Sequence, residues 1–303
     1  MTRVSFENLL DAGVHFGHLR RKWNPNMAPY IFMERNGIHI IDLYKTEAKL
    51  QEAQNAIKQI AKSGRRILFV ATKKQAKEIV AEAVKKVNMP YVTERWPGGM
   101  LTNFATIRKA VRKMTNIDKL MTTNSYNILS KRERLHITRE RAKLEKNLGS
   151  IADMSRLPAA IFVVDINKEK ISVAEARKLN IPVFAMVDTN TDPTLVDFAI
   201  PANDDASKSI ALIVNAMTMA IAEGLNERRA AREKQQAEEE KKAAEKAREA
   251  EEAAKETVVD IPEEVEDKLV KGEKPEPKIH KLREGSKGES KPKRPRKIIT
   301  KKK

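Results

Sequence analysis

The sequence contains no cysteine among its 303 residues. This absence excludes disulfide bonds, thiolate metal ligands, iron–sulfur clusters and catalysis by a thiol. Aromatic residues are also scarce, at 5% of the chain. The most apolar stretches, residues 161–166 and 210–221, are too short or too polar to predict a membrane span. Because the first residues lack the apolar core of a signal peptide, we expect a cytosolic protein that does not act at a membrane.

Acidic residues are too few to balance the basic ones. The chain has 59 Lys and Arg against 42 Asp and Glu, a formal net charge of +17 at pH 7. A soluble chain with such an excess is typical of proteins that bind a polyanion, and nucleic acid is the first candidate.

The charge pattern divides the chain. Residues 227–277 carry 12 basic and 17 acidic side chains, and residues 278–303 carry 12 basic and 2 acidic ones. This composition cannot bury enough apolar surface to offset the entropy of ordering, so we predict a disordered charged tail over 227–303, or a solvated helix followed by a basic end. Residues 1–103 and 150–226 should form the globular domain, with an insertion at 104–149.

Apolar runs alternate with helical patterns in the globular part. Strands are expected at residues 38–43, 67–71, 159–165 and 183–188, and helices at 45–62, 73–87, 173–179 and 206–225, the last ended by Gly224. Short buried strands separated by amphipathic helices predict an open, doubly wound α/β fold with a parallel sheet.

The insertion breaks this alternation. Residues 104–121 and 130–148 have helical spacing with no strand between them, and 104–149 carries 12 basic and 4 acidic residues. We therefore predict an antiparallel helical hairpin. Four cations at spacings of one, three and four residues should form a stripe that contacts RNA phosphates, unless they only keep a solvated arm soluble: Arg108, Lys109, Arg112 and Lys113.

The sequence carries no recognisable catalytic motif. Neither a dinucleotide-binding glycine pattern nor a phosphate loop follows the early strands, and no nucleophile elbow occurs. Thr72 could cap a helix whose first turn holds Lys73 and Lys74, which would suit a phosphate of a nucleic-acid backbone; a plain surface helix is an equal alternative.

One histidine pair suggests a metal. His15 and His18 lie three residues apart, and Asp188 and Asp204 follow late strands, so together they could bind zinc. The competing interpretation is that these histidines only hydrogen-bond a loop. No other cofactor is expected.

Two loops combine cations with aromatic side chains, a mixture used for phosphate contact and base stacking. The first holds Arg20, Arg21, Lys22 and Trp23. The second holds Arg95 and Trp96, followed by Gly98 and Gly99, which could instead form a hinge for the hairpin. Trp23 and Tyr30 of the first loop could equally be apolar plugs over the sheet.

Several segments in order resemble the bacterial ribosomal protein S2 family: residues 9–18, 23–31, 35–43, 95–104, 158–165 and 175–183. The resemblance spans about residues 4–223. It implies a Rossmann-like, flavodoxin-like sheet with an inserted coiled-coil hairpin and no catalysis. It also implies a place between the head and body of the small ribosomal subunit, with small-subunit ribosomal RNA and neighbouring proteins, notably ribosomal protein S1, as partners. The tail after Leu225 exceeds the family pattern.

Three classes of function therefore compete. A structural RNA-binding protein explains the basic hairpin and the missing motifs together. A nucleotide-dependent enzyme explains only the sheet, and a protein of anionic membranes explains only the Lys-rich end.

Overall fold

The computed structural model describes residues 4–256, of which those as far as Glu240 form one compact unit. Its centre is a five-stranded parallel sheet with the order β5-β4-β6-β7-β8. The strands are β4 (Ile67–Val70), β5 (Tyr91–Val92), β6 (Ala160–Val164), β7 (Val183–Val187) and β8 (Phe198–Pro201). Counted from β4, this is the 2-1-3-4-5 order of flavodoxin-like sheets. The predicted α/β fold with a parallel sheet is confirmed.

Alternate residues of the parallel strands pack into two separate hydrophobic cores, one on each face of the sheet. Ile67 and Phe69 face one core, which is closed by α2 (Leu43–Lys62), α3 (Lys77–Lys86) and α8 (Ser207–Glu256). Leu68 and Val70 face the other, which is closed by α7 (Lys170–Lys178) and the base of the inserted helices. Helices thus cover both faces, as the unbroken apolar strands require.

A second, antiparallel sheet contains β1 (Phe16–Leu19), β2 (Ile31–Arg35) and β3 (Ile38–Ile41), in the order β1-β3-β2. The expectation that residues 38–43 begin the parallel sheet is therefore wrong. Asn36 and Gly37 both have positive φ, 54° and 75°, the geometry of a tight β2–β3 hairpin. The small sheet sits closely on the domain, because a Cβ at Gly17 would lie 2.6 Å from Thr189 Cγ2.

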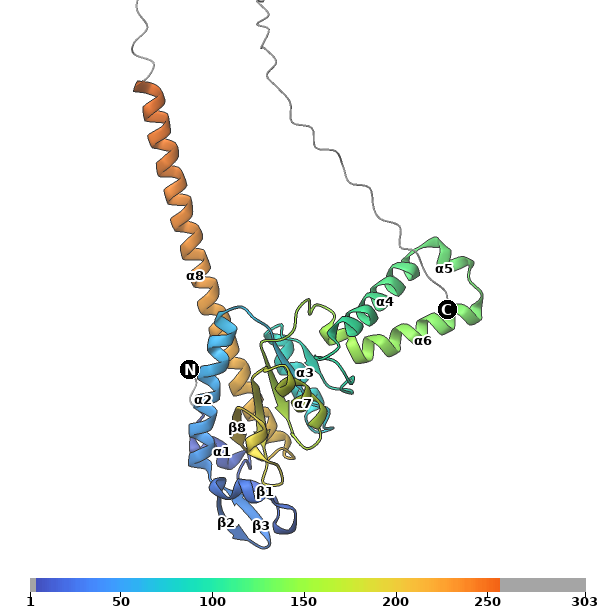
Figure 1. The fold of residues 1–303 in the computed structure, drawn as a ribbon, viewed down its shortest axis with the longest axis vertical. Coiled ribbons are helices and arrows are strands. Elements are labelled where there is room, and N and C mark those ends of the chain that lie inside the picture. The colour runs from blue at the N-terminus through green and yellow to red at the C-terminus, as the bar shows by residue number, and fades with distance from the viewer. Residues whose placement is uncertain (1–3, 257–303) are drawn as a thin grey trace, which may run out of the picture. The chain divides into compact units, whose positions relative to one another are not determined.

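The insertion is a pair of helices, α4 (Phe104–Thr122) and α6 (Lys131–Leu148), connected through the short α5 (Asn124–Ile128) (Figure 1). The two long helices lie where the sequence predicts them. Ser130 and Glu133 form a capping box that starts α6. Along the pair, Lys113 contacts Glu140 and Arg141 Nε lies 2.5 Å from Asp118 Oδ1.

The closing helix α8 does not end at Gly224 but runs on to Glu256. A Cβ at Gly224 would lie 2.6 Å from the carbonyl oxygen of Lys58, so glycine here permits close packing of α8 on α2. Glu227 pairs with Lys58 Nζ at 2.7 Å. Residues 227–256 are therefore helical, which is the second of the two alternatives predicted for the tail, and residues 257–303 lie outside the described residues.

Residues Ser207–Glu240 form one helix that is long and apolar enough to cross a membrane by length and composition alone. Ile210, Ile213, Met217 and Ile221 on this helix are fully buried against the sheet. Their burial accounts for the apolar composition as that of a core helix.

Candidate functional site

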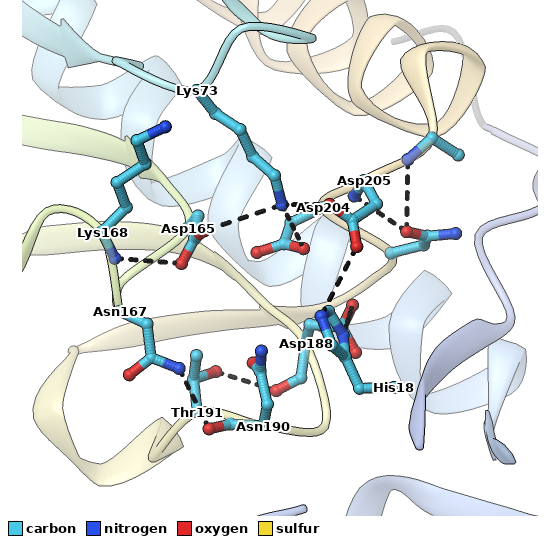
Figure 2. A network of polar contacts seen from close by, with 12 residues as sticks. His18, Lys73, Asp165, Asn167, Lys168, Asp188, Asn190, Thr191, Asp204 and Asp205 are labelled. Carbon is cyan, nitrogen blue, oxygen red and sulfur yellow. Dashed lines mark hydrogen bonds and ion pairs between the residues drawn. The ribbon is translucent and has the colours of Figure 1, made fainter. Parts of the chain in front are cut away.

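Charged side chains converge at the carboxyl edge of the parallel sheet (Figure 2). Asp165 follows β6, Asp188 follows β7, and Asp204 and Asp205 follow β8. The Lys73 ammonium, on the loop after β4, lies 2.9 Å from Asp204 Oδ1, 2.6 Å from Asp205 Oδ1 and 3.6 Å from Asp165 Oδ2. Parallel strands end at one edge, so carboxylates distant in the chain meet a single lysine there.

The small sheet adds His18 to this cluster. His18 Nδ1 lies 2.9 Å from Asp188 Oδ2, and Nε2 lies 3.4 Å from Asp205 Oδ2. The hydrogen bond to Asp188 raises the pKa of His18 despite partial burial. Burial, with Asp188 and Asp165 nearby, raises the pKa of Asp204 to about 7. The pKa of Lys73 is also raised, because its bonds to Asp205 and Asp204 outweigh its burial.

Three of the four predicted metal ligands come together. His18, Asp188 and Asp204 each present a ligand atom within 4.8 Å of the others. Asp204 is 1% exposed, and its Oδ2 is buried without a hydrogen-bond partner. His15 does not join them: its ring packs on Phe16 at 4.0 Å, and burial lowers its pKa. The inclusion of His15 is therefore corrected.

The usual ligand position of this fold is already filled by the chain's own groups. In flavodoxin-like sheets ligands bind where the strand order reverses, here between the ends of β4 and β6. Glu169 accepts hydrogen bonds from the Thr72 hydroxyl and, at 3.0 Å, from the Thr72 amide. Helix α3 begins only at Lys77, so Thr72 does not cap it. Lys73 is 8% exposed and paired with aspartates, so its predicted contact with phosphate is corrected, whereas Lys74 is exposed.

A buried carboxylate organises the loop before the helical insertion. Glu175 on α7 accepts bonds from Trp96 Nε1 (3.2 Å), the Gly99 amide (2.7 Å), the Leu101 amide (2.9 Å) and the Thr102 amide (3.2 Å). Trp96 is only 7% exposed, so its predicted stacking on RNA is corrected. Gly99 has φ of 81°, which supports the hinge interpretation, and Arg95 is exposed.

A groove of about 1190 Å³ opens where the inserted helices leave the sheet. Its floor includes Ile107, Ala110 and Leu144, and four cations line it: Arg95, Arg139, Lys143 and Lys168. Three carboxylates also line the groove: Glu94 pairs with Lys77 and Lys146, Glu140 contacts Lys113, and Glu169 accepts the hydrogen bonds of Thr72. Within residues 4–256 no ion pair joins the four lining cations to a carboxylate. The groove therefore presents net positive charge.

Only two of the four cations predicted to form a stripe on α4 are exposed without a contact to another group of the described residues. Lys109 and Arg112 are exposed, but Arg108 is half-buried and donates to the Met154 carbonyl at 3.2 Å, and Lys113 contacts Glu140.

The loop over residues 20–23 keeps most of its charge at the surface. Arg20, 69% exposed, lies 3.3 Å from Glu34, and Arg21 and Lys22 are exposed. Trp23 packs on His39 with ring centroids 5.2 Å apart and is 37% exposed. The Trp23 ring is therefore partly covered, as expected if it packs as an apolar plug over the sheet.

The sequence did not identify Asp165, Glu169 and Glu175 as site residues. An Asp directly after two of the apolar strands, Asp165 after β6 and Asp188 after β7, was an available signal for the cluster. The signal for Glu175 was weaker: it lies between Val173 and Ala176, the apolar positions that face the core.

The fold and these sites define a basic α/β protein with a positively charged groove beside a helical insertion. A family model described as ribosomal protein S2 matches residues 9–224. The chain therefore belongs to the ribosomal protein S2 family. As a member, it is a protein of the cytoplasmic ribosome and not an enzyme.

Curated relatives agree over most of their length. The chain is 68% identical over 236 residues to a small ribosomal subunit protein uS2 of Flavobacterium johnsoniae, covering 78% of this chain and 93% of the relative. It is 68% identical over 237 residues to the Phocaeicola vulgatus uS2 protein (78% and 85%) and 68% identical over 232 residues to that of Porphyromonas gingivalis (77% and 83%).

Proposed function

We propose that this protein is a structural component of the small ribosomal subunit and binds small-subunit ribosomal RNA between its head and body. The observation that carries the proposal is the groove whose four cations have no carboxylate partner among the described residues. Phosphates would supply the missing counter-charge, and Lys109 and Arg112 continue the positive surface along α4. The helical arm, pairing as a coiled coil, would hold these cations against the RNA.

The groove proposal is tested by replacing Arg139 and Lys143 with Gln and measuring affinity for transcribed small-subunit RNA over a range of salt. Removing one phosphate-binding cation should reduce the slope of log affinity against log salt by roughly one unit, by analogy with DNA. Glu82→Gln, an exposed change on α3, controls for handling. An unchanged slope in a folded variant would assign the RNA-binding surface to another part of the protein.

We also propose that neighbouring proteins, ribosomal protein S1 among them, dock on the small antiparallel sheet. Phe16, Ile40 and Met33 pair across its three strands, so they share one face, and Phe16 and Met33 are 51% and 48% exposed. Apolar side chains in a continuous exposed row are typical of protein interfaces. Replacing Phe16 and Met33 with Ser should weaken co-sedimentation with S1 while leaving RNA affinity unchanged.

His18, Asp188 and Asp204 are proposed as ligands of a divalent cation such as zinc. The unpartnered Oδ2 of Asp204 supports this, because a buried carboxylate oxygen without a donor is costly unless a cation satisfies it. Nitrogen and carboxylate ligands suit zinc. The Lys73 ammonium already neutralises the other oxygen of Asp204, so a bound cation would share this carboxylate with the lysine.

A further inference from the structure

A second cationic hollow lies at the opposite, amino edge of the parallel sheet. It has a volume of about 550 Å³ and is lined by Gly64, Arg65, Arg66, Arg156 and the neighbouring residues Ser155, Leu157, Pro158 and Ala159. The chain enters β4 through Arg65 and Arg66, and enters β6 after Arg156. Because parallel strands also begin at one edge, arginines about 90 residues apart in sequence converge on this hollow.

The guanidinium of a fourth arginine, Arg228, lies against Gly64, which lines the hollow. A Cβ added to Gly64, which has φ of +76°, would lie 1.6 Å from the terminal nitrogen of Arg228. The Arg228 guanidinium therefore lies directly on the backbone of Gly64, at the wall of the hollow. This contact comes from the part of α8 that follows Gly224, so it depends on the helix continuing through that residue.

No acidic residue lines this hollow, in contrast to the groove beside the helical insertion. Within the described residues, no ion pair joins Arg65, Arg66, Arg156 or Arg228 to a carboxylate, whereas nearby Lys58 and Lys62 both pair with Glu227. Like charges gathered around one concavity repel each other unless an anion lies between them. The guanidinium fork matches the oxygens of a phosphate in bidentate geometry.

We infer that this hollow, the arginine pocket, binds the phosphate backbone of structured RNA as a contact separate from the groove. The inference rests on the proposed RNA-binding function but assigns it a second surface, on the other edge of the sheet. Ligands of open α/β sheets bind at the carboxyl edge, so the fold itself does not account for four arginines at the amino edge. The groove and the arginine pocket would grip RNA from two edges of one domain.

The test uses a triple variant, Arg65→Gln, Arg66→Gln and Arg156→Gln, with small-subunit RNA transcribed in vitro as the probe. Each phosphate contact contributes roughly 0.7–0.9 decade of affinity at 0.1 M salt, so removing three should weaken binding about 100-fold and flatten the salt slope by roughly two to three units. The matched control removes three exposed cations outside the pocket, Lys85→Gln, Lys86→Gln and Lys178→Gln. It should stay within a few-fold of wild type.

The absence of cysteine allows a direct second measurement. Ser155→Cys places the only thiol of the chain at the pocket, where a tethered iron–EDTA reagent should cleave RNA at a focused site. The same thiol in the triple variant should give little cleavage. Thermal unfolding of each variant establishes that it is folded.

The outcomes separate the two proposals. If wild-type protein does not bind the RNA, the proposed function fails. If it binds, and the triple variant binds equally well with no cleavage from Cys at position 155, the arginine pocket is not an RNA contact while the proposed function stands. If RNA affinity is unchanged but incorporation into subunits falls, an acidic protein segment occupies the pocket and the inference is overturned.

Discussion

Replacing Glu175 with Gln should destabilise the protein severely, although the two side chains have nearly the same shape. The carboxylate serves five donors: Trp96 Nε1 and the Gly99 amide on one oxygen, and the Leu101 amide, the Thr102 amide and the Thr102 hydroxyl on the other. Gln keeps one acceptor oxygen and places its amide NH2 group, which is itself a donor, against the remaining donors. One buried and one partly buried N–H group then lose their acceptor, whichever oxygen is replaced.

Each buried donor left unsatisfied costs about 1–3 kcal/mol, so the free energy of unfolding should fall by about 4 kcal/mol. For a domain of this size that corresponds to a decrease of about 8–16 °C in the unfolding midpoint. The chain has only two tryptophans, so Trp23→Phe makes Trp96 fluorescence a reporter of this loop. Trp96→Phe removes a single donor and should cost less, about 1 kcal/mol.

The pH dependence gives an independent check. Burial of Glu175 acts to raise its pKa, but the bonds from Leu101, Gly99 and Trp96 outweigh it, so the pKa lies below the ordinary 4.5. A carboxylate with a lowered pKa stabilises the fold above its unfolded-state value and loses this contribution as pH falls through the folded value. The gap between wild type and Glu175→Gln should therefore narrow below about pH 4.5. A Gln variant within about 0.5 kcal/mol of wild type at pH 7 would refute this account of the loop.

Four further outcomes are expected. Lys109→Gln with Arg112→Gln should lower the salt slope of RNA binding by about two units, and an unchanged slope would show that this face of α4 does not contact RNA. Elemental analysis after dialysis should find zinc in wild type and almost none in His18→Ala; less than about a tenth of an equivalent in wild type would reject the metal site. Removing residues 241–303 should leave the unfolding midpoint and incorporation unchanged, because the last ion pairs of α8 with α2 among the described side chains are those of Glu227; a folded but unincorporated product would make the tail a binding element. Gly224→Ala should cost about 1–3 kcal/mol in chemical unfolding despite its better helix propensity, since the methyl group overlaps the Lys58 carbonyl; a more stable variant would contradict that contact.

The sequence predicts the central architecture because strand burial leaves a strong trace. Residues 67–71, 159–164 and 183–187 are uninterrupted apolar runs, and each contains a central strand of the sheet. The two edge strands leave little trace: β5 has only two residues, and β8 ends in a proline. The segment 38–43 is apolar enough to pass for a parallel strand, and the Asn36–Gly37 turn that assigns it to a hairpin was the overlooked signal.

Charge is harder to place than apolar burial. A lysine beside a strand end is equally typical of a phosphate contact and of an internal ion pair, and the difference depends on which chain-distant carboxylates meet it. Lys73 is buried because β6 and β8 end at the same edge of the sheet as β4, an arrangement that no local pattern encodes. Trp96 is buried for a similar reason, since its acceptor Glu175 lies on a helix 79 residues later. Arg95 and Arg112 are exposed and have no ion pair within the described residues, and their role in RNA binding stays a prediction.

The order of synthesis determines when α8 can pack on the sheet. Proteins emerge amino end first, and domains fold as their last packing partner arrives. The face of the sheet that bears Phe69, Phe162 and Phe184 is covered in part by Ile213 and Met217 of α8, the last core element to be made. Until then this apolar face lacks part of its cover. The 82 residues after Ile221 take roughly 4–16 s to add at about 5–20 residues per second, so the helix can dock before their synthesis is complete.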